Sequence, residues 1–266
     1  MRILNDRFEV EGLLRAVRLA RNRVLFLDYD GTLAPFIVPR EDARPYPGVV
    51  PLLRELCALA RHRLVLVSGR PARQLAGLLP PLDPFPTIWG SNGMEELAPE
   101  GELRTAAITP DARRIIDRET LRLEAALGAQ HVERKPVGVA VHVRGLSPKA
   151  AAETLDALRG PWGDLVRLHG LTSWEFDGGL ELSGGTRSKG DVVAEVVRDL
   201  EPPIASAFLG DDQTDEEAFR AMRGRGASIL VRPSLRPTAA DLWLRPPGEL
   251  LGFLTQWRDA ATGVEA

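Results

Sequence analysis

Short apolar runs alternate with segments of helical periodicity over most of the chain. Mainly apolar runs of three or four residues predict strands at 24–27, 64–67, 87–89, 207–209, 228–231 and 242–244. The first two are apolar throughout, which is typical of strands buried on both faces of a parallel sheet. Apolar residues at helical spacing predict helices near these runs, at residues 10–17, 47–61 and 192–197.

The pattern changes between residues 95 and 184. Amphipathic helices are predicted at 110–127 and 147–158. In residues 138–144, three valines alternate with alanine, histidine and arginine, so the predicted strand has one apolar face and one polar face. A sheet with one face buried differs from the fully buried strands on either side of this region.

These two patterns together predict an α/β protein. We expect a Rossmann-like parallel-sheet core made from residues 1–94 and 185–266. An α+β domain, residues 95–184, would be inserted between the two parts of this core.

The composition excludes two classes of partner. Lys plus Arg total 34 and Asp plus Glu total 37, so the net charge of −3 gives no positive field to attract nucleic acid or an anionic membrane. The single cysteine, Cys57, cannot form an internal disulfide and is expected in the core. No run approaches the roughly 18 apolar residues of a membrane helix. We expect a cytoplasmic protein, a monomer or weak oligomer, that acts on a small molecule.

Polar clusters follow three of the predicted strands, at residues 28–32, 68–70 and 210–215. Ligands bind beyond the carboxyl ends of the strands in open parallel sheets, so the fold would bring several carboxylates together there. Such a concentration of negative charge is usually offset by a divalent cation, and oxygen ligands suit Mg²⁺. The expected ligands are Asp28, Asp30, Asp211 and Asp212.

The same clusters contain the groups that phosphoryl transfer needs. Asp28 can attack phosphorus, and Asp30 can protonate the leaving oxygen and later deprotonate the attacking water. Ser68 and Gly69 would bind the phosphate, together with Lys189 at the start of a helix whose dipole favours anions.

Each motif alone also has a structural interpretation. The Asp-x-Asp-Gly-Thr segment at residues 28–32 could be only a turn, and Asp211 or Asp212 could cap a helix beginning near Thr214. A lysine such as Lys189 is often a solvated helix residue. The occurrence of all these motifs in order, at strand ends and a helix start, favours catalysis.

These elements resemble the motifs of the haloacid dehalogenase superfamily of phosphatases. Within it, residues 210–216 (Gly-Asp-Asp-Gln-Thr-Asp-Glu) followed by Phe219 resemble the trehalose-6-phosphate phosphatases. The resemblance spans residues 24–257 and implies a Mg²⁺-dependent phosphoric monoester hydrolase of trehalose biosynthesis. It also implies that residues 95–184 form a cap domain that recognises the substrate.

The resemblance assigns five cap residues to sugar binding: Glu133, Lys135, His142, Arg144 and Glu181. The first two share a face if their segment is a strand, and so do His142 and Arg144. Carboxylates that accept hydrogen bonds and cations that donate them suit sugar hydroxyls. The alternative is that these charges only solvate an exposed face.

Two departures from the family pattern concern the sugar. Asn92 stands where the family commonly has histidine, and Ser183 with Gly184 replaces an Arg-Pro pair. Hydrolysis of trehalose 6-phosphate therefore competes with hydrolysis of another glycosyl phosphate, such as a glucosylglycerol or pseudo-disaccharide phosphate. A non-catalytic sugar-phosphate sensor and a phosphosugar mutase are further alternatives.

Overall fold

The structure is a computed structural model and describes residues 1–263. The chain divides into two compact units. We call Met1–Leu103 with Ser188–Ala266 the core unit, and Arg104–Arg187 the inserted unit. No helix within residues 1–263 has the length and apolar character needed to cross a membrane.

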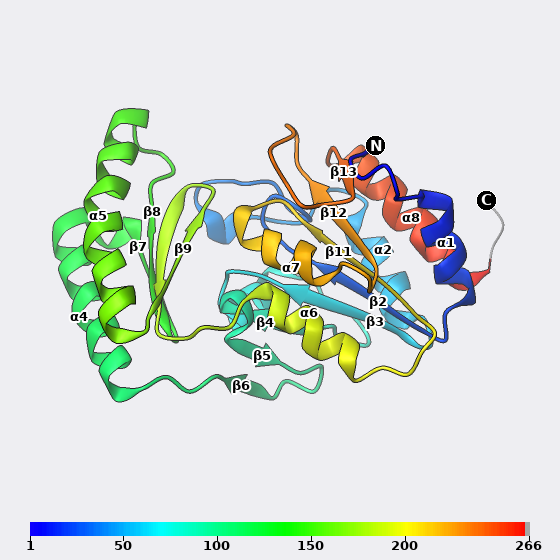
Figure 1. Ribbon diagram of the computed structural model, residues 1–266, viewed down its shortest axis with the longest axis horizontal. Coiled ribbons are helices and arrows are strands. Elements are labelled where there is room, and N and C mark those ends of the chain that lie inside the picture. The colour runs from blue at the N-terminus through cyan, green and yellow to red at the C-terminus, as the bar shows by residue number, and fades with distance from the viewer. Residues whose placement is uncertain (264–266) are drawn as a thin grey trace. The chain divides into compact units, whose positions relative to one another are not determined.

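A nine-stranded sheet forms the centre of the core unit, in the order β1-β13-β12-β11-β2-β3-β4-β5-β6 (Figure 1). The strands from β13 to β4 are parallel, whereas β1 and β5 pair antiparallel with their neighbours. Their bounds are β1 (Arg2–Ile3), β2 (Asn22–Leu27), β3 (His62–Val67), β4 (Thr87–Gly90), β5 (Glu95–Leu97), β6 (Leu103–Thr105), β11 (Ile204–Gly210), β12 (Ala227–Val231) and β13 (Leu242–Leu244).

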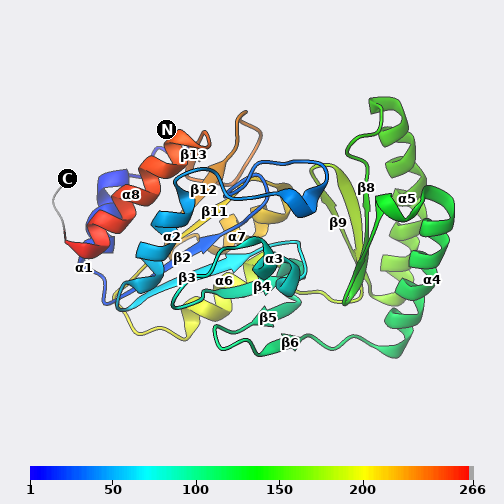
Figure 2. The same cartoon turned by 180° about the vertical axis from the view of Figure 1, so that it is seen from behind.

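Helices cover both faces of this sheet, as Figures 1 and 2 show. On one face lie α1 (Val10–Leu19), α2 (Val49–Ala58), α3 (Ala72–Leu78) and α8 (Gly248–Thr262). On the other lie α6 (Lys189–Arg198) and α7 (Glu216–Ala221). In β2, Leu25 and Leu27 pack on the first side and Val24 and Phe26 on the second, which explains why the strand is apolar throughout.

The inserted unit is a four-stranded antiparallel sheet with two helices on one face. The strand order is β7-β8-β10-β9, and the helices are α4 (Pro110–Leu127) and α5 (Pro148–His169). The strands are β7 (Val132–Lys135), β8 (Gly138–His142), β9 (Thr172–Phe176) and β10 (Gly179–Ser183). Val139 and Val141 of β8 pack against helical residues that include Leu123 and Trp162. The α/β fold class, with a parallel-sheet core and an inserted α+β domain, is confirmed.

Some boundaries differ from those predicted. The inserted unit begins at Arg104 rather than at residue 95, because β5 extends the core sheet beside β4. Helix α5 continues through Pro161 to His169, although the predicted helix ended at residue 158. Leu158 and Trp162, four residues apart, are both buried against the sheet, and this packing maintains the helix past a proline that removes one backbone hydrogen bond.

Candidate active site

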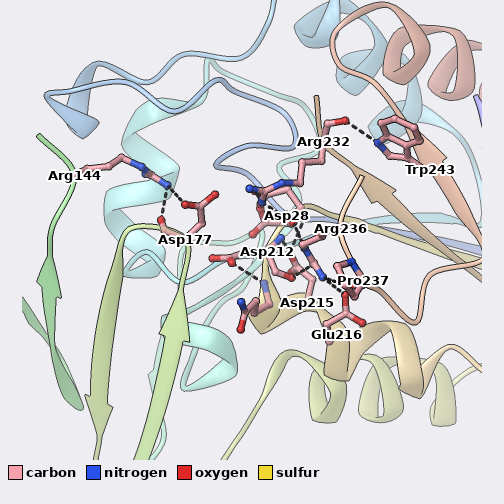
Figure 3. Close-up of polar contacts among 12 residues, drawn as sticks. Asp28, Arg144, Asp177, Asp212, Asp215, Glu216, Arg232, Arg236, Pro237 and Trp243 are labelled. Atoms are coloured by element: carbon pink, nitrogen blue, oxygen red, sulfur yellow. Dashed lines mark hydrogen bonds and ion pairs between the residues drawn. The ribbon is translucent and has the colours of Figure 1, made fainter. Parts of the chain in front are cut away.

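Three buried carboxylates lie together at the carboxyl end of the core sheet. Asp28 follows β2, Asp211 follows β11, and these strands are parallel neighbours. Asp215 lies four residues further along, in the turn before α7. Each of the three offers an oxygen within 4.8 Å of the others, and all are buried. Figure 3 shows Asp28 and Asp215 in this part of the core unit.

Lys189 joins this cluster from the first residue of α6. Its Nζ donates hydrogen bonds to Asp28 Oδ1 at 2.7 Å and to Asp215 Oδ1 at 2.6 Å. Burial lowers the pKa of Lys189, but the charges of Asp215 and Asp28 outweigh this effect and raise it above its usual value. The lysine is therefore a permanent cation beside Asp28. The fold thus brings together three residues that are far apart in the sequence: Asp28, Lys189 and Asp211. This agrees with the expectation that polar residues gather beyond the carboxyl ends of the strands.

Asp215 orders the segment that carries Asp211. Its Oδ2 accepts hydrogen bonds from the backbone N–H groups of Asp211 at 2.9 Å and Asp212 at 2.8 Å. A side chain at Gly210 would place its Cβ 2.4 Å from Asp215 Cγ, so only glycine fits there. Asp215 was not among the residues predicted for the site. Its position in the Gly-Asp-x-x-x-Asp segment, residues 210–215, is the sequence feature that could have indicated a role in the site.

The cluster fits a divalent cation. Within residues 1–263, neither carboxylate oxygen of Asp211 accepts a hydrogen bond, although both are buried; Arg232 Nη1 lies 3.8 Å from Oδ2. Burial raises the pKa of Asp28 to about 8, and the charge of Asp215 adds to this while Lys189 opposes it. Burial, followed by the charge of Asp28, also raises the pKa of Asp211. The three buried carboxylates outnumber the two nearby cations, Lys189 and Arg232, and their oxygens are suitable Mg²⁺ ligands.

The backbone at Gly31 leaves space beside Asp211. Gly31 has a positive φ of 81°, which disfavours other residues, and a Cβ there would lie 2.3 Å from Asp211 Oδ2. The glycine after the Asp-x-Asp pair therefore permits both the turn and the close approach of the Asp211 carboxylate.

Two other expected metal ligands have different contacts. The Asp30 carboxylate accepts hydrogen bonds from Arg70 Nε at 2.6 Å and Nη2 at 2.7 Å. Asp212 accepts from the backbone N–H of Gln213 at 2.6 Å and is the N-cap of the short helix Gln213–Asp215. The capping alternative thus describes Asp212 but not Asp211. A metal-binding role for Asp30 and Asp212 stays a prediction.

Ser68 and Gly69 lie at the same edge of the sheet as Asp28. Strand β3 is parallel to β2, and Leu66 pairs with Leu27, so Ser68 follows close to the level of Asp28. Ser68 is buried, and its Oγ accepts a hydrogen bond from the backbone N–H of Arg70 at 3.2 Å. Its hydroxyl proton can therefore still be donated, for example to a phosphate oxygen.

The predicted sugar-binding residues gather on one face of the inserted unit. Glu133 and Glu181 both pair with Ala140, so they share the face opposite the two helices. Glu133 Oε2 lies 2.9 Å from His142 Nε2, and Lys135 forms an ion pair with Glu181.

Arg144 lies two residues beyond the end of β8. It donates a hydrogen bond to the backbone oxygen of Asp177, and this contact is drawn in Figure 3. On the polar face and at its margin, each of these carboxylates therefore lies next to a lysine, histidine or arginine side chain.

Comparison with known proteins relates this geometry to a family. A model of the trehalose-phosphatase family matches residues 26–244. A trehalose-phosphate phosphatase of Mycobacterium avium is 32% identical over 260 residues, which are 90% of this chain and 63% of that protein. One of Mycobacterium ulcerans is 30% identical, over 86% of this chain and 60% of its own length. The chain thus spans less than two thirds of the length of these relatives.

Solved structures show the same fold. The C-terminal domain of a C. albicans trehalose-6-phosphate phosphatase has a TM-score of 0.79 at 18% identity, covering 97% of this chain and 99% of that one. A haloacid dehalogenase-like hydrolase from B. subtilis has a TM-score of 0.58 at 15% identity, covering 87% and 98%. The family match covers most of the sequence and includes the three strand-end clusters, so this chain belongs to the trehalose-phosphatase family.

Proposed function

We propose that this chain hydrolyses trehalose 6-phosphate to trehalose and phosphate, with Mg²⁺ and through a phosphoryl group held on Asp28. One observation carries the proposal: Lys189 contacts Asp28 within a buried cluster that also contains Asp211 and Asp215. The similarity to mycobacterial trehalose-phosphate phosphatases supports the choice of substrate.

Asp28 is the proposed nucleophile. One of its oxygens is held by Lys189, which fixes the carboxylate and leaves the other oxygen to attack phosphorus. Bound Mg²⁺ would supply positive charge that favours ionised Asp28 and offsets the negative charge of the phosphate. Asp28, Asp211 and Asp215 are the residues that would hold the ion, and Asp30 and Asp212 remain candidates.

Asp30 is the proposed acid and base. A carboxyl group two residues from the nucleophile can give its proton to the leaving sugar oxygen and then take one from the attacking water. Arg70 donates hydrogen bonds to both Asp30 oxygens, which orients the carboxylate. During proton transfer, one Asp30 oxygen has to break its hydrogen bond to Arg70 or keep it while also contacting the substrate oxygen or the water.

Ser68, Gly69 and Lys189 are the proposed phosphate ligands. The Ser68 hydroxyl and the Gly69 backbone N–H can donate to phosphate oxygens, and Lys189 adds a cation. Lys189 also begins a ten-residue helix, whose dipole favours an anion at this end.

The polar face of the inserted unit is the proposed sugar-binding surface. Glu133, Lys135, His142 and Glu181 present acceptors and donors on this face, and Arg144 lies at its margin. Because the departures at Asn92, Ser183 and Gly184 concern recognition rather than phosphoryl transfer, another glycosyl phosphate remains the second candidate substrate.

The fold alone does not separate an enzyme from a sensor. The C-terminal domain of a Candida albicans trehalose synthase regulatory protein has a TM-score of 0.66 with this chain. Here Asp28, Asp30, Lys189 and Asp211 are all present, which supports catalysis. A phosphosugar mutase would return phosphate to a sugar hydroxyl, so release of inorganic phosphate distinguishes hydrolysis from transfer.

Phosphate release across a panel of sugar phosphates, with Mg²⁺ and with EDTA, tests the proposal. We expect the highest kcat/KM on trehalose 6-phosphate and no turnover in EDTA. Glu133→Ala and Lys135→Ala should lower this kcat/KM by roughly tenfold or more, because each removes a hydrogen-bonding group from the proposed sugar-binding face, but should spare an aryl phosphate. Lys149→Ala, an exposed lysine on α5, is the control. Preference for a monosaccharide phosphate, or equal losses on both substrates, would contradict the assignment.

A further inference from the structure

An arginine in the connection between β12 and β13, Arg236, contacts the backbone of Asp211 and Asp212. Arg236 Nε donates to the backbone oxygen of Asp211 at 3.2 Å, and its Nη2 donates to that of Asp212 at 2.6 Å. Figure 3 shows Arg236 beside Asp212 and Asp215. Its side chain is only 16% exposed, so these bonds are largely shielded from water.

Glu216 fixes the position of Arg236. One of its carboxylate oxygens pairs with Arg236 Nη1, and the other accepts the backbone N–H of Ala239 at 2.7 Å. Glu216 is the first residue of α7 and is itself mostly buried. The β12–β13 connection is therefore attached to the start of α7 at two points.

Arg236 and Asp215 both form hydrogen bonds with the peptide group between Asp211 and Asp212. The peptide between Asp211 and Asp212 has its oxygen bonded to Arg236 and, at the longer distance of 3.4 Å, to Arg232, and its N–H bonded to Asp215. The Asp211 N–H is also bonded to Asp215, and the Asp212 oxygen to Arg236. The backbone on both sides of Asp211 is thus fixed without using either oxygen of its carboxylate.

We propose that Arg236, oriented by Glu216, is a positioning residue that presets Asp211 for Mg²⁺. The proposal rests on the assignment of Asp211 as a metal ligand. Arg236 binds backbone oxygens of the segment rather than the Asp211 carboxylate, so it orders this ligand without competing with the metal. Partners that orient metal ligands typically change metal affinity by about 10–100-fold when removed.

Calorimetric titration of the metal-free full chain with Mg²⁺ tests this role. Arg236→Met should weaken Mg²⁺ binding by about tenfold or more, and excess Mg²⁺ should restore most of kcat. Arg236→Lys keeps the charge but loses the planar fork, so it should bind Mg²⁺ with intermediate affinity. Glu216→Gln should weaken binding in the same direction. Arg220→Met changes an exposed arginine on the same helix and should bind like the wild type.

The outcomes separate this role from the proposed function. A wild type that binds no Mg²⁺ would reject the metal site itself. Wild-type affinity in Arg236→Met, or an equal loss in Arg220→Met, would reject the positioning role. If Arg236→Met does not fold, as judged by thermal unfolding in EDTA, the lysine and Glu216→Gln variants decide, and unchanged affinity in both would overturn the proposal.

Discussion

The Asp215 carboxylate contacts both the ammonium group of Lys189 and the backbone of the site. It accepts hydrogen bonds from Lys189 and from the N–H groups of Asp211 and Asp212, and it is fully buried. A carboxylate with three donors can be buried at low cost, because each lost water contact is replaced. It therefore serves both the stability of the core unit and the geometry around Asp28.

Asp215→Asn should lower both the stability of the core unit and the catalytic rate. The asparagine amide would direct an N–H group at Lys189 or at the backbone donors, leaving a buried cation with one partner. We expect the free energy of unfolding to fall by about 3 kcal/mol and kcat to fall by at least about tenfold. Glu217→Gln, a half-buried neighbour on α7, is the control. Urea unfolding and phosphate release in parallel measure the effects, and a variant that matches the control in both would refute this role.

The sequence predicted that acidic residues would gather, but it did not show which acids would face one another. Asp28 and Asp211 follow neighbouring strands, so their approach follows from the parallel sheet. Asp30 instead pairs with Arg70, a residue from another strand end 40 positions away. Such long-range pairings depend on side-chain directions after a turn, which local spacing does not encode.

At the scale of elements, the parallel strands of the core sheet were predicted more reliably than the helix ends. The parallel strands have short apolar runs because both faces are covered, and this signal is local. Helix α8 was not predicted, although Leu250, Phe253, Leu254 and Trp257 follow helical spacing and are buried. The length of α5 could not be predicted either, because tertiary packing maintains it through Pro161.

We expect the contact between β3 and α8 to make the stability of the core unit depend on pH. His62, the first residue of β3, is 8% exposed, and its Nε2 accepts a hydrogen bond from Trp257 Nε1 at 2.9 Å. Burial, with the charge of Arg23, lowers the pKa of His62 to about 4. Because the unfolded chain binds this proton near pH 6.5, the folded state loses stability as the pH falls from about 6.5 towards 4.

We expect wild-type protein to lose about 2 kcal/mol of unfolding free energy between pH 7 and pH 5 through His62. His62→Gln keeps an acceptor for Trp257 but cannot titrate, so its loss over this interval should be smaller by that amount. His169→Gln, an exposed histidine at the end of α5, is the control. Urea unfolding at both pH values measures the difference. Equal slopes for the wild type and His62→Gln would show that His62 does not cause the acid sensitivity.

For the whole molecule, the proposed chemistry and the proposed recognition belong to different units. The carboxylate cluster, Lys189 and Ser68 lie in the core unit, whereas the polar face that carries Glu133 and Lys135 lies in the inserted unit. The change from buried strands to a one-sided sheet revealed this division in the sequence. The boundary at residue 104 was harder to predict from the sequence, because β5 and β6 extend the core sheet beyond its parallel strands.

The most direct test of the account is to locate the phosphoryl group during turnover. Asp30→Asn should accumulate it when given an aryl phosphate, whose leaving group needs no proton, because the base for the second step is absent. After rapid acid quenching, peptide mapping by mass spectrometry should find phosphate on Asp28, only when Mg²⁺ was present. Phosphate on another residue, or equal labelling when Asp28→Asn is combined with Asp30→Asn, would contradict the account.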